Sequence, residues 1–308
     1  MIAAAGLTPA WQRIMVFDRI TLGEVNRAAR IVECISGKVT NTAIAARSLG
    51  GDVTAVLPVG PNVWEKVKRE TAELKLACEF VPTATPTRTC VTVIDRASGQ
   101  VTELVEDAAP LASSELAAFA ERLRRCCAKA EILVFSGSLP RGTPPEIYRD
   151  LLSECPIPVI ADFRGPGLMA VLPLRPLLVK PNRAELEATL SCSFRDDQHL
   201  IAGMEELCRR GAVWTLVSQG SAAVWLASQN EVYRFDPPIP DTVENPIGCG
   251  DALAGALAWA VHNGVSVPEA VRIGVAAAQD NLRTLLPCRL DPAWVRLCAE
   301  RIPVVRLR

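Results

Sequence analysis

The sequence predicts an α/β fold with a mostly parallel central sheet and a small antiparallel β lid. Two observations predict the sheet: short apolar segments alternate with longer segments of helical pattern, and Gly or Pro bounds most of the apolar segments. Such alternation is typical of right-handed βαβ units. A third observation predicts the lid, because two early stretches alternate polar and apolar residues, as strands with one wet face do.

Six apolar segments are expected to form the main sheet. Their near-continuous apolar character fits strands that are covered on both faces. In chain order these segments are Ile2–Ala5, Val53–Val59, Ile132–Ser136, Val159–Ala161, Leu177–Val179 and Trp214–Ser218.

Seven segments have the length and the apolar spacing of helices that connect such strands. In chain order they are Asn41–Leu49, Ser114–Ala128, Pro144–Leu152, Arg183–Leu190, Asp197–Arg210, Gly250–His262 and Pro268–Arg283. The alternating stretches, Arg13–Ser36 and Arg88–Glu106, are expected to supply lid strands within about residues 12–37 and 88–106. We expect the lid to cover the carboxyl edge of the sheet, where open α/β folds bind ligands.

The composition fits one globular domain over residues 1–308. The chain has 33 Lys and Arg against 34 Asp and Glu, so the net charge does not indicate a nucleic-acid or membrane partner. Neither a membrane-spanning stretch nor a secretory signal is evident, and a cytoplasmic protein is expected. The 11 cysteines are scattered, which favours buried thiols over a disulfide framework or a zinc site.

The most informative local motif is NPIGCGD, which ends at Asp251 and precedes a small apolar helix. Gly248, Cys249 and Gly250 would expose backbone N–H groups at the start of that helix, where the helix dipole also favours an anion. Asp251 in the first turn could then act as a general base toward a nearby hydroxyl. The same residues could instead form an ordinary glycine turn with an N-capping aspartate.

Three further segments place polar residues at strand ends or beside the lid. One of them, LVFSGSLPRG, ends a strand with Ser136 and could equally be an ordinary turn. The segment LLVKPNRAEL holds Lys180, Asn182 and Glu185, which could organise phosphates and hydrated Mg²⁺, although a solvated helix face would look the same. Lys38 and Arg88 could hold an anionic substrate, although isolated basic residues are usually surface residues.

The order and spacing of these motifs decide between the interpretations. Nearly the whole chain resembles the ribokinase-like (phosphofructokinase B) carbohydrate kinases, and most closely the branch of 1-phosphofructokinase and tagatose-6-phosphate kinase. The segments that carry the resemblance include LTPAWQR, DRITLGEVNRAAR, SGKVTNTAIAARSLG, TRTCVTVID, VTELVEDAAP, SGSLPRGTPPEIY, VIADFRG, LLVKPNRAEL, LVSQGSAAVWL and NPIGCGDALAGALA. The resemblance implies a ribokinase-like three-layer α/β/α sandwich with a β lid.

The resemblance also implies an activity and a set of site residues. The activity is transfer of the γ-phosphate of ATP, assisted by Mg²⁺, to a sugar or sugar phosphate, with Asp251 as the base and Gly248, Cys249 and Gly250 as the anion hole. The implied substrate-binding residues are Gln12, Gly37, Lys38, Asn41, Arg88 and Ser136. The implied nucleotide-binding residues are Lys180, Asn182, Ser218, Gly220 and Asn281, and Glu185 would hold Mg²⁺ through water. A homodimer formed through the lid is implied as well.

The chain departs from the family pattern on the substrate side. Gln12 stands where the family has an aspartate that holds sugar hydroxyls, and Val39 replaces a glycine. Val105 stands where this branch has an asparagine, and Arg164 where a small residue is usual. Because a hydrogen bond to a charged group contributes about 1.5–3 kcal/mol, the usual sugar could bind about 10- to 100-fold more weakly here.

Three hypotheses follow from this division between an intact transfer site and an altered substrate side. The first is a kinase whose substrate has changed. The second is a non-catalytic regulatory protein on the same scaffold, and the third is a nucleoside or vitamin kinase, which the pair Lys38 and Arg88 disfavours. Cys249 lies at a helix N-terminus, an environment that lowers the pKa of a thiol, and the sequence leaves open whether the protein is sensitive to thiol reagents.

Overall fold

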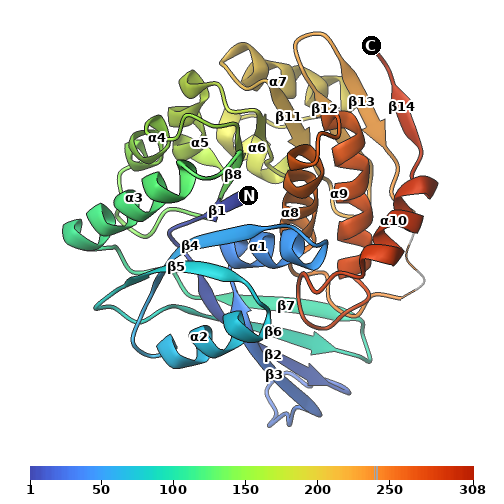
Figure 1. Ribbon diagram of the computed structural model, residues 1–308. Coiled ribbons are helices and arrows are strands. Elements are labelled where there is room, and N and C mark those ends of the chain that lie inside the picture. The colour runs from blue at the N-terminus through green and yellow to red at the C-terminus, as the bar shows by residue number, and fades with distance from the viewer. Residues whose placement is uncertain (239, 241) are drawn as a thin grey trace.

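The computed structural model describes residues 1–238, 240 and 242–308 of the chain and has three layers, with a central sheet between two groups of helices (Figure 1). In the described part of the chain the central sheet has ten strands, in the order β14-β13-β12-β11-β10-β9-β8-β1-β4-β5. The strands from β11 to β5 are parallel, and β12, β13 and β14 extend the sheet in antiparallel pairs. The predicted mostly parallel sheet is therefore confirmed.

The strands of this sheet closely follow the predicted segments. Their bounds are β1 (Ile2–Ala5), β4 (Val53–Val59), β5 (Ala77–Pro82), β8 (Ile132–Ser136), β9 (Val159–Asp162), β10 (Leu178–Val179), β11 (Trp214–Val217), β12 (Val224–Ala227), β13 (Val232–Phe235) and β14 (Val304–Arg306). Every residue of β1 and of β8 is buried, because one helix layer covers each face. Sequence analysis missed β5, β12, β13 and β14; of these, β5 and β14 are exposed edge strands with a weak apolar pattern.

One layer of helices packs with the apolar cluster that contains Ile2, Ala4 and Val134. Its members are α1 (Lys38–Ser48), α2 (Trp64–Glu73), α8 (Cys249–His262), α9 (Val267–Asn281) and α10 (Pro292–Arg301). The other layer packs with the cluster that contains Ala3 and Phe135. Its members are α3 (Ser113–Cys127), α4 (Glu146–Ser153), α5 (Gly165–Val171) with a 3₁₀ turn (Leu172–Leu174), α6 (Arg183–Leu190) and α7 (Asp197–Arg209). No helix in the described ranges is long and apolar enough to cross a bilayer.

The lid is a separate sheet of four described strands in the order β3-β2-β6-β7. Their bounds are β2 (Ala10–Phe17), β3 (Arg30–Ser36), β6 (Thr89–Asp95) and β7 (Gln100–Val105). Each hairpin, β2/β3 and β6/β7, is antiparallel as predicted, but β2 and β6 join the hairpins as a parallel pair. The parallel pair arises because β2 follows β1 and β6 follows β5, so both strands leave the same edge of the parallel sheet.

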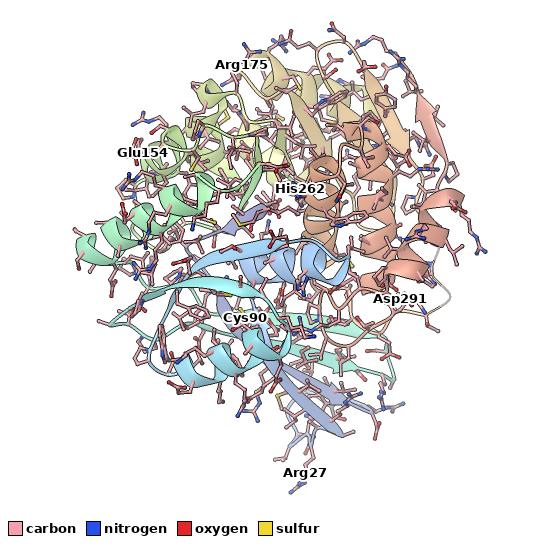
Figure 2. The ribbon with its side chains drawn as sticks, in the orientation of Figure 1. Arg27, Cys90, Glu154, Arg175, His262 and Asp291 are labelled. Atoms are coloured by element: carbon pink, nitrogen blue, oxygen red, sulfur yellow. The ribbon has the colours of Figure 1, made fainter. Side chains whose placement is uncertain are left out.

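The tip of the β2/β3 hairpin extends away from the main sheet, and Arg27 marks it in Figure 2. The opposite end of the lid stays close to the main domain, where Gly37 has a φ of +92° and links β3 to α1. A side chain at Gly37 would lie 2.9 Å from the backbone of Thr8 and Pro9. The glycine therefore lets the end of β3 approach the start of β2 and fixes how the lid joins the sheet.

Candidate active site

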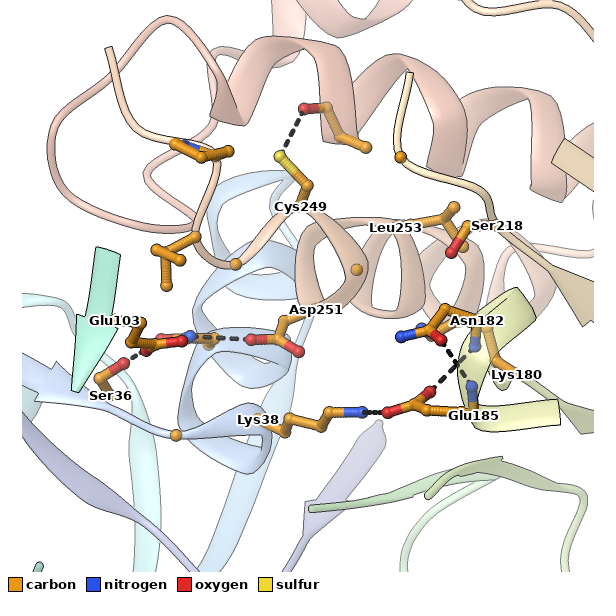
Figure 3. A pocket seen from close by; sticks show the side chains of 18 of the residues that line it. Ser36, Lys38, Glu103, Lys180, Asn182, Glu185, Ser218, Cys249, Asp251 and Leu253 are labelled. Atoms are coloured by element: carbon orange, nitrogen blue, oxygen red, sulfur yellow. Dashed lines mark hydrogen bonds and ion pairs between the residues drawn. The ribbon is translucent and has the colours of Figure 1, made fainter. Parts of the chain in front are cut away.

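A cavity of about 470 Å³ lies between the lid and the ends of the central strands. Most of the predicted site residues line it together, although they come from segments far apart in the chain. The predicted residues that line it are Gln12, Gly37, Lys38, Asn41, Arg88, Lys180, Asn182, Glu185, Ser218, Gly220, Gly248, Cys249, Gly250 and Asp251. Figure 3 shows this arrangement, with Asp251 at the start of α8 and with Lys38 and Glu185 pointing toward one another.

The start of α8 presents backbone N–H groups to the cavity. Gly248 caps the helix with a φ of +89°, a conformation that favours glycine. Among the described residues, the N–H groups of Gly248 and Gly250 donate to no protein acceptor, whereas that of Cys249 donates to the carbonyl of Pro246 at 3.4 Å. Gly248 and Gly250 both line the cavity, so two N–H groups without an acceptor among the described residues lie there beside the positive end of the helix dipole.

Asp251 is buried beside these amides, and its Oδ2 accepts a hydrogen bond from Asn41 Nδ2 at 2.8 Å. Burial raises the pKa of Asp251 to about 6, and the negative charge of Asp162 acts in the same direction. The positive charges of Lys38 and Lys180 and the Asn41 hydrogen bond oppose this increase in pKa. The result is a carboxylate with the proton affinity that a general base needs near neutral pH.

An ion cluster that sequence analysis missed lies behind the cavity. Asp162, at the end of β9, is fully buried, and its Oδ1 is 3.0 Å from Lys38 Nζ and 3.1 Å from Lys180 Nζ. Burial alone would raise the pKa of Asp162, but the two lysines reverse the effect and lower it. The sequence signal was an acidic residue closing the apolar strand VIAD, which parallel strand order brings to the cavity.

Asn182 and Glu185 form a capping box at the start of α6. The Asn182 side chain accepts from the Glu185 N–H at 2.8 Å, and Glu185 Oε2 accepts from the Asn182 N–H at 2.9 Å. These two residues therefore have a structural role, and they also line the cavity. The KPNRAE motif thus fixes a helix start at the edge of the site.

The donor set near Glu185 fits a magnesium ion that is held mainly through water. Glu185 lines the cavity and offers a carboxylate there, whereas Asp162 Oδ2, which has no hydrogen-bond partner among the described residues, is fully buried and does not line the cavity. No group of three His, Cys, Asp or Glu side chains suited to a metal occurs in the part of the chain that the structure describes. Mg²⁺ commonly keeps several waters and takes only one or two carboxylates from a protein.

Two predicted residues do not line the cavity. Asn281 is fully buried, donates through Nδ2 to the Ile247 carbonyl at 3.0 Å and accepts from the Cys288 N–H at 2.7 Å. Its side chain therefore shapes the loop before α8, and its predicted place beside the nucleotide stays a prediction. Ser136, at the end of β8, is also buried, which places its hydroxyl inside the protein and not on the cavity wall.

The two cations expected to hold an anionic substrate are engaged within the protein. Lys38 bonds to Asp162, as described above. Arg88 donates to the carbonyls of Thr8 at 3.0 Å, Glu106 at 3.2 Å and Pro9 at 3.4 Å. Arg88 therefore joins the base of the lid to the main domain, and three of its five N–H groups are already used.

The departures from the family pattern have different structural meanings. Val39 is buried in the apolar core of α1 and does not line the cavity, so its bulk does not obstruct the site. Gln12 does line the cavity, and its Nε2 donates to Thr92 Oγ1 at 2.5 Å. Of these departures, Gln12 and Val105 line the cavity, whereas Val39 does not.

The expected low pKa of Cys249 is wrong. Burial raises the pKa of this thiol to about 11. Its Sγ donates to the Ala278 carbonyl at 3.4 Å and lies 3.3 Å from Asn281 Nδ2. The side chain packs between α8 and α9, away from the N–H groups that would stabilise a thiolate.

Several cavity residues were not predicted. Most come from lid strands, from β12, from the segment after β13 and from the faces of α8 and α9, where the tertiary packing brings them to the site. They are Ser36, Cys90, Glu103, Val105, Val224, Pro237, Pro246, Ile247, Leu253, Val275, Ala278 and Gln279. Pro246 and Ile247 belong to the NPIGCGD motif, and Val105 was named only as a departure from the family pattern.

The geometry agrees with the similarity to known proteins. A family model described as pfkB family carbohydrate kinase matches residues 6–285. The chain is similar to phosphofructokinase-2 from Escherichia coli in complex with fructose-6-phosphate, at 27% identity and a TM-score of 0.87, over 98% of this chain and 99% of that chain. The tetrameric inhibited form of phosphofructokinase-2 from the same organism matches at 26% identity and a TM-score of 0.88, over 97% and 98%. A possible 1-phosphofructokinase from Thermotoga maritima, at 20% identity, shares the fold with a TM-score of 0.91 over 100% of both chains.

Proposed function

The chain belongs to the pfkB family of carbohydrate kinases, and from that premise we propose that it transfers the γ-phosphate of ATP to a hydroxyl of a sugar or sugar phosphate. One observation carries the proposal. Asp251, with a pKa of about 6, shares the cavity with the free N–H groups of Gly248 and Gly250. Phosphoryl transfer to a hydroxyl needs such a base beside groups that stabilise negative charge.

In this mechanism Asp251 accepts the proton of the attacking hydroxyl. Asn41 holds one carboxylate oxygen through its 2.8 Å hydrogen bond, which leaves the other oxygen for the proton. The N–H groups of Gly248 and Gly250 stabilise the charge that spreads over the transferred phosphoryl group. When bound with the nucleotide, Mg²⁺ would supply further positive charge at the phosphates, and Glu185 would hold its waters.

The nucleotide would occupy the end of the cavity away from the lid. Polar groups from Lys180, Asn182 and Ser218 line that end beside the start of α6. The wall formed by α8, α9 and the neighbouring strand is apolar, as a purine ring requires, and includes Val224, Leu253, Val275 and Ala278. Lys180 carries its positive charge into the cavity between these two regions.

A homodimer formed through the lid completes the proposal. Side chains alternate across a strand, so the neighbours of the cavity-facing residues lie on the opposite, outer face of the lid. That outer face exposes Ile31 at 47% and Leu104 at 57%, and Val91 pairs with Leu104 across the strands. An exposed apolar sheet face of this kind is typical of a protein interface, and the similar phosphofructokinase-2 is described as tetrameric.

Release of ADP, measured across a panel of sugars and sugar phosphates, tests the proposed activity. We expect Asp251→Asn to lower kcat by about 100- to 10,000-fold, the usual contribution of a general base. Because the raised pKa shows that the protein disfavours the charged form of Asp251, the variant should melt at a temperature no lower than the wild type.

Asp52→Asn is the matched control, since Asp52 is exposed and outside the cavity. It should leave turnover unchanged. Equal turnover in Asp251→Asn and wild type would reject the mechanism. Binding of sugar and ATP without any turnover would instead support the regulatory hypothesis.

A further inference from the structure

The lid face that lines the cavity carries an acidic residue that has no hydrogen-bond or ion-pair partner among the residues that the structure describes. Gln12 on β2 pairs with Cys90 on β6, and Thr92 on β6 pairs with Glu103 on β7. Residues two apart on a strand share a face, so these four side chains lie on one side of the lid. Gln12, Cys90 and Glu103 line the cavity, and Figure 3 shows Glu103 at the lid end of it.

The Gln12 side chain, on the lid face that lines the cavity, cannot act as a carboxylate. Its amide is neutral, and its Nε2 is committed to Thr92 Oγ1 at 2.5 Å. The amide therefore offers a sugar at most one acceptor oxygen. A carboxylate would accept from two hydroxyls with the assistance of its charge.

Glu103 supplies a carboxylate from β7, which is separated from β2 by β6. Within the described residues its side chain makes no hydrogen bond and no ion pair with the protein. The other acidic side chains of the cavity are engaged, Asp251 with Asn41 and Glu185 with the start of α6. Glu103 is thus an acidic side chain of the cavity lining for which the described residues provide no such partner.

Glu103 is an exposed residue of β7 that also lines the cavity. Nearby lid atoms remove part of its water and raise its pKa, while the positive charge of Arg88 opposes the shift. Arg88 itself points its N–H groups at backbone carbonyls. The cation therefore moderates the charge of Glu103 without closing an ion pair over it.

We propose that Glu103 is a specificity-determining residue that accepts hydrogen bonds from hydroxyl groups of the acceptor sugar, and so replaces the carboxylate that position 12 lacks. The inference rests on the proposed kinase function, because it assigns the acceptor to the lid end of the same cavity. It also fixes the orientation of the acceptor. Hydroxyl groups, and not a phosphate, face β7, because a phosphate beside the unpaired carboxylate would be repelled.

Calorimetric titration with fructose and with fructose 6-phosphate tests the proposal, with the enzyme loaded with a non-hydrolysable ATP analogue and Mg²⁺ so that no turnover occurs. Glu103→Gln should weaken binding of the probe sugar that the wild type binds by about 10- to 100-fold, as loss of charge-assisted hydrogen bonds predicts. Affinity for the ATP analogue should stay unchanged. Glu65→Gln is the matched control, because Glu65 is exposed on α2 and does not line the cavity.

A second variant distinguishes the loss of the Glu103 carboxylate from a loss of folded structure. Gln12→Asp in the Glu103→Gln background returns a carboxylate to the same lid face and should recover part of the lost affinity. Unchanged binding in Glu103→Gln would overturn the proposal, and so would tighter binding of fructose 6-phosphate, which would place the phosphate at β7. Failure of the wild type to bind either sugar would overturn it too. These outcomes concern binding alone, so they are distinct from a failure of the ADP-release test.

Discussion

Asp251 must be deprotonated to act as a base, yet the protein around it favours the protonated form. Burial and the charge of Asp162 raise its pKa to about 6, and the hydrogen bond from Asn41 limits that rise. A group that loses its function on protonation produces an acid limb in the pH profile. The activity should therefore fall as the pH drops through about 6.

The pH profile of kcat/KM tests whether activity falls at low pH and whether protonation of Asp251 is the cause. Asn41→Leu removes a hydrogen bond to the charged carboxylate, so the pKa of Asp251 should rise and the acid limb should move up by about one pH unit or more. Ser36→Ala is the control, because the Ser36 hydroxyl bonds to Asn41 Oδ1 at 3.3 Å and not to Asp251. If the acid limb of the Asn41→Leu profile stays at the wild-type pH, a group other than Asp251 determines it.

At the scale of the elements, the position of the site depends on how closely α8 packs against α1. Gly255 lies in this contact, where an added Cβ would be 2.4 Å from the Thr42 carbonyl oxygen and 2.7 Å from Ala45 Cβ. Because α8 carries Asp251 and α1 carries Asn41, a wider spacing would separate the base from its hydrogen-bond donor. The glycine is thus needed for the close approach of two helices that build the site.

Gly255→Ala should lower the free energy of unfolding by about 1–3 kcal/mol, the usual cost of overpacking, and should lower kcat as well. Equilibrium denaturation and ADP release measure the two effects. Gly50→Ala is the comparison, since Gly50 has a φ of +88° but no atoms within 4 Å of an added Cβ. It should cost about 1 kcal/mol through backbone strain and leave kcat unchanged. Wild-type stability and kcat in Gly255→Ala would refute the packing argument.

At the scale of the whole molecule, the lid has two faces with different tasks. The inner face lines the cavity through Gln12, Cys90 and Glu103. The outer face exposes apolar side chains, including Leu104 at 57%, which we assign to the homodimer interface. If the lid forms the interface, the assembly state and the shape of the acceptor site are linked through one sheet.

Leu104→Asp should convert the dimer to a monomer, because a buried unpaired charge at an interface costs several kcal/mol. Light scattering after size-exclusion chromatography measures the mass directly. Leu297→Asp is a closely matched control, since Leu297 on α10 is also 57% exposed but lies outside the lid. A wild-type monomer, or a Leu104→Asp dimer, would contradict the assignment.

Much of the fold could be predicted from local patterns. β1, β4 and β8 were predicted with the bounds that the structure shows, because strands covered on both faces are continuously apolar. α2 and β5 were missed because α2 buries only two of its residues and β5 only one, which leaves little apolar pattern to detect. The parallel pairing of β2 and β6 was not foreseen, since it depends on which edge of the main sheet both strands leave.

Sequence alone determined six strands of the central sheet, the family and the helix start that carries Asp251, because these depend on periodicity and on motifs of a few neighbouring residues. Only the tertiary structure decided which charged groups remain free for a ligand. Lys38 is bound to Asp162, 124 positions away, and Arg88 to the carbonyl of Thr8, 80 positions away, whereas Glu103 has no partner among the described residues. The energy between two charged groups depends on the distance between them in space. The number of residues that separate them along the chain does not specify that distance.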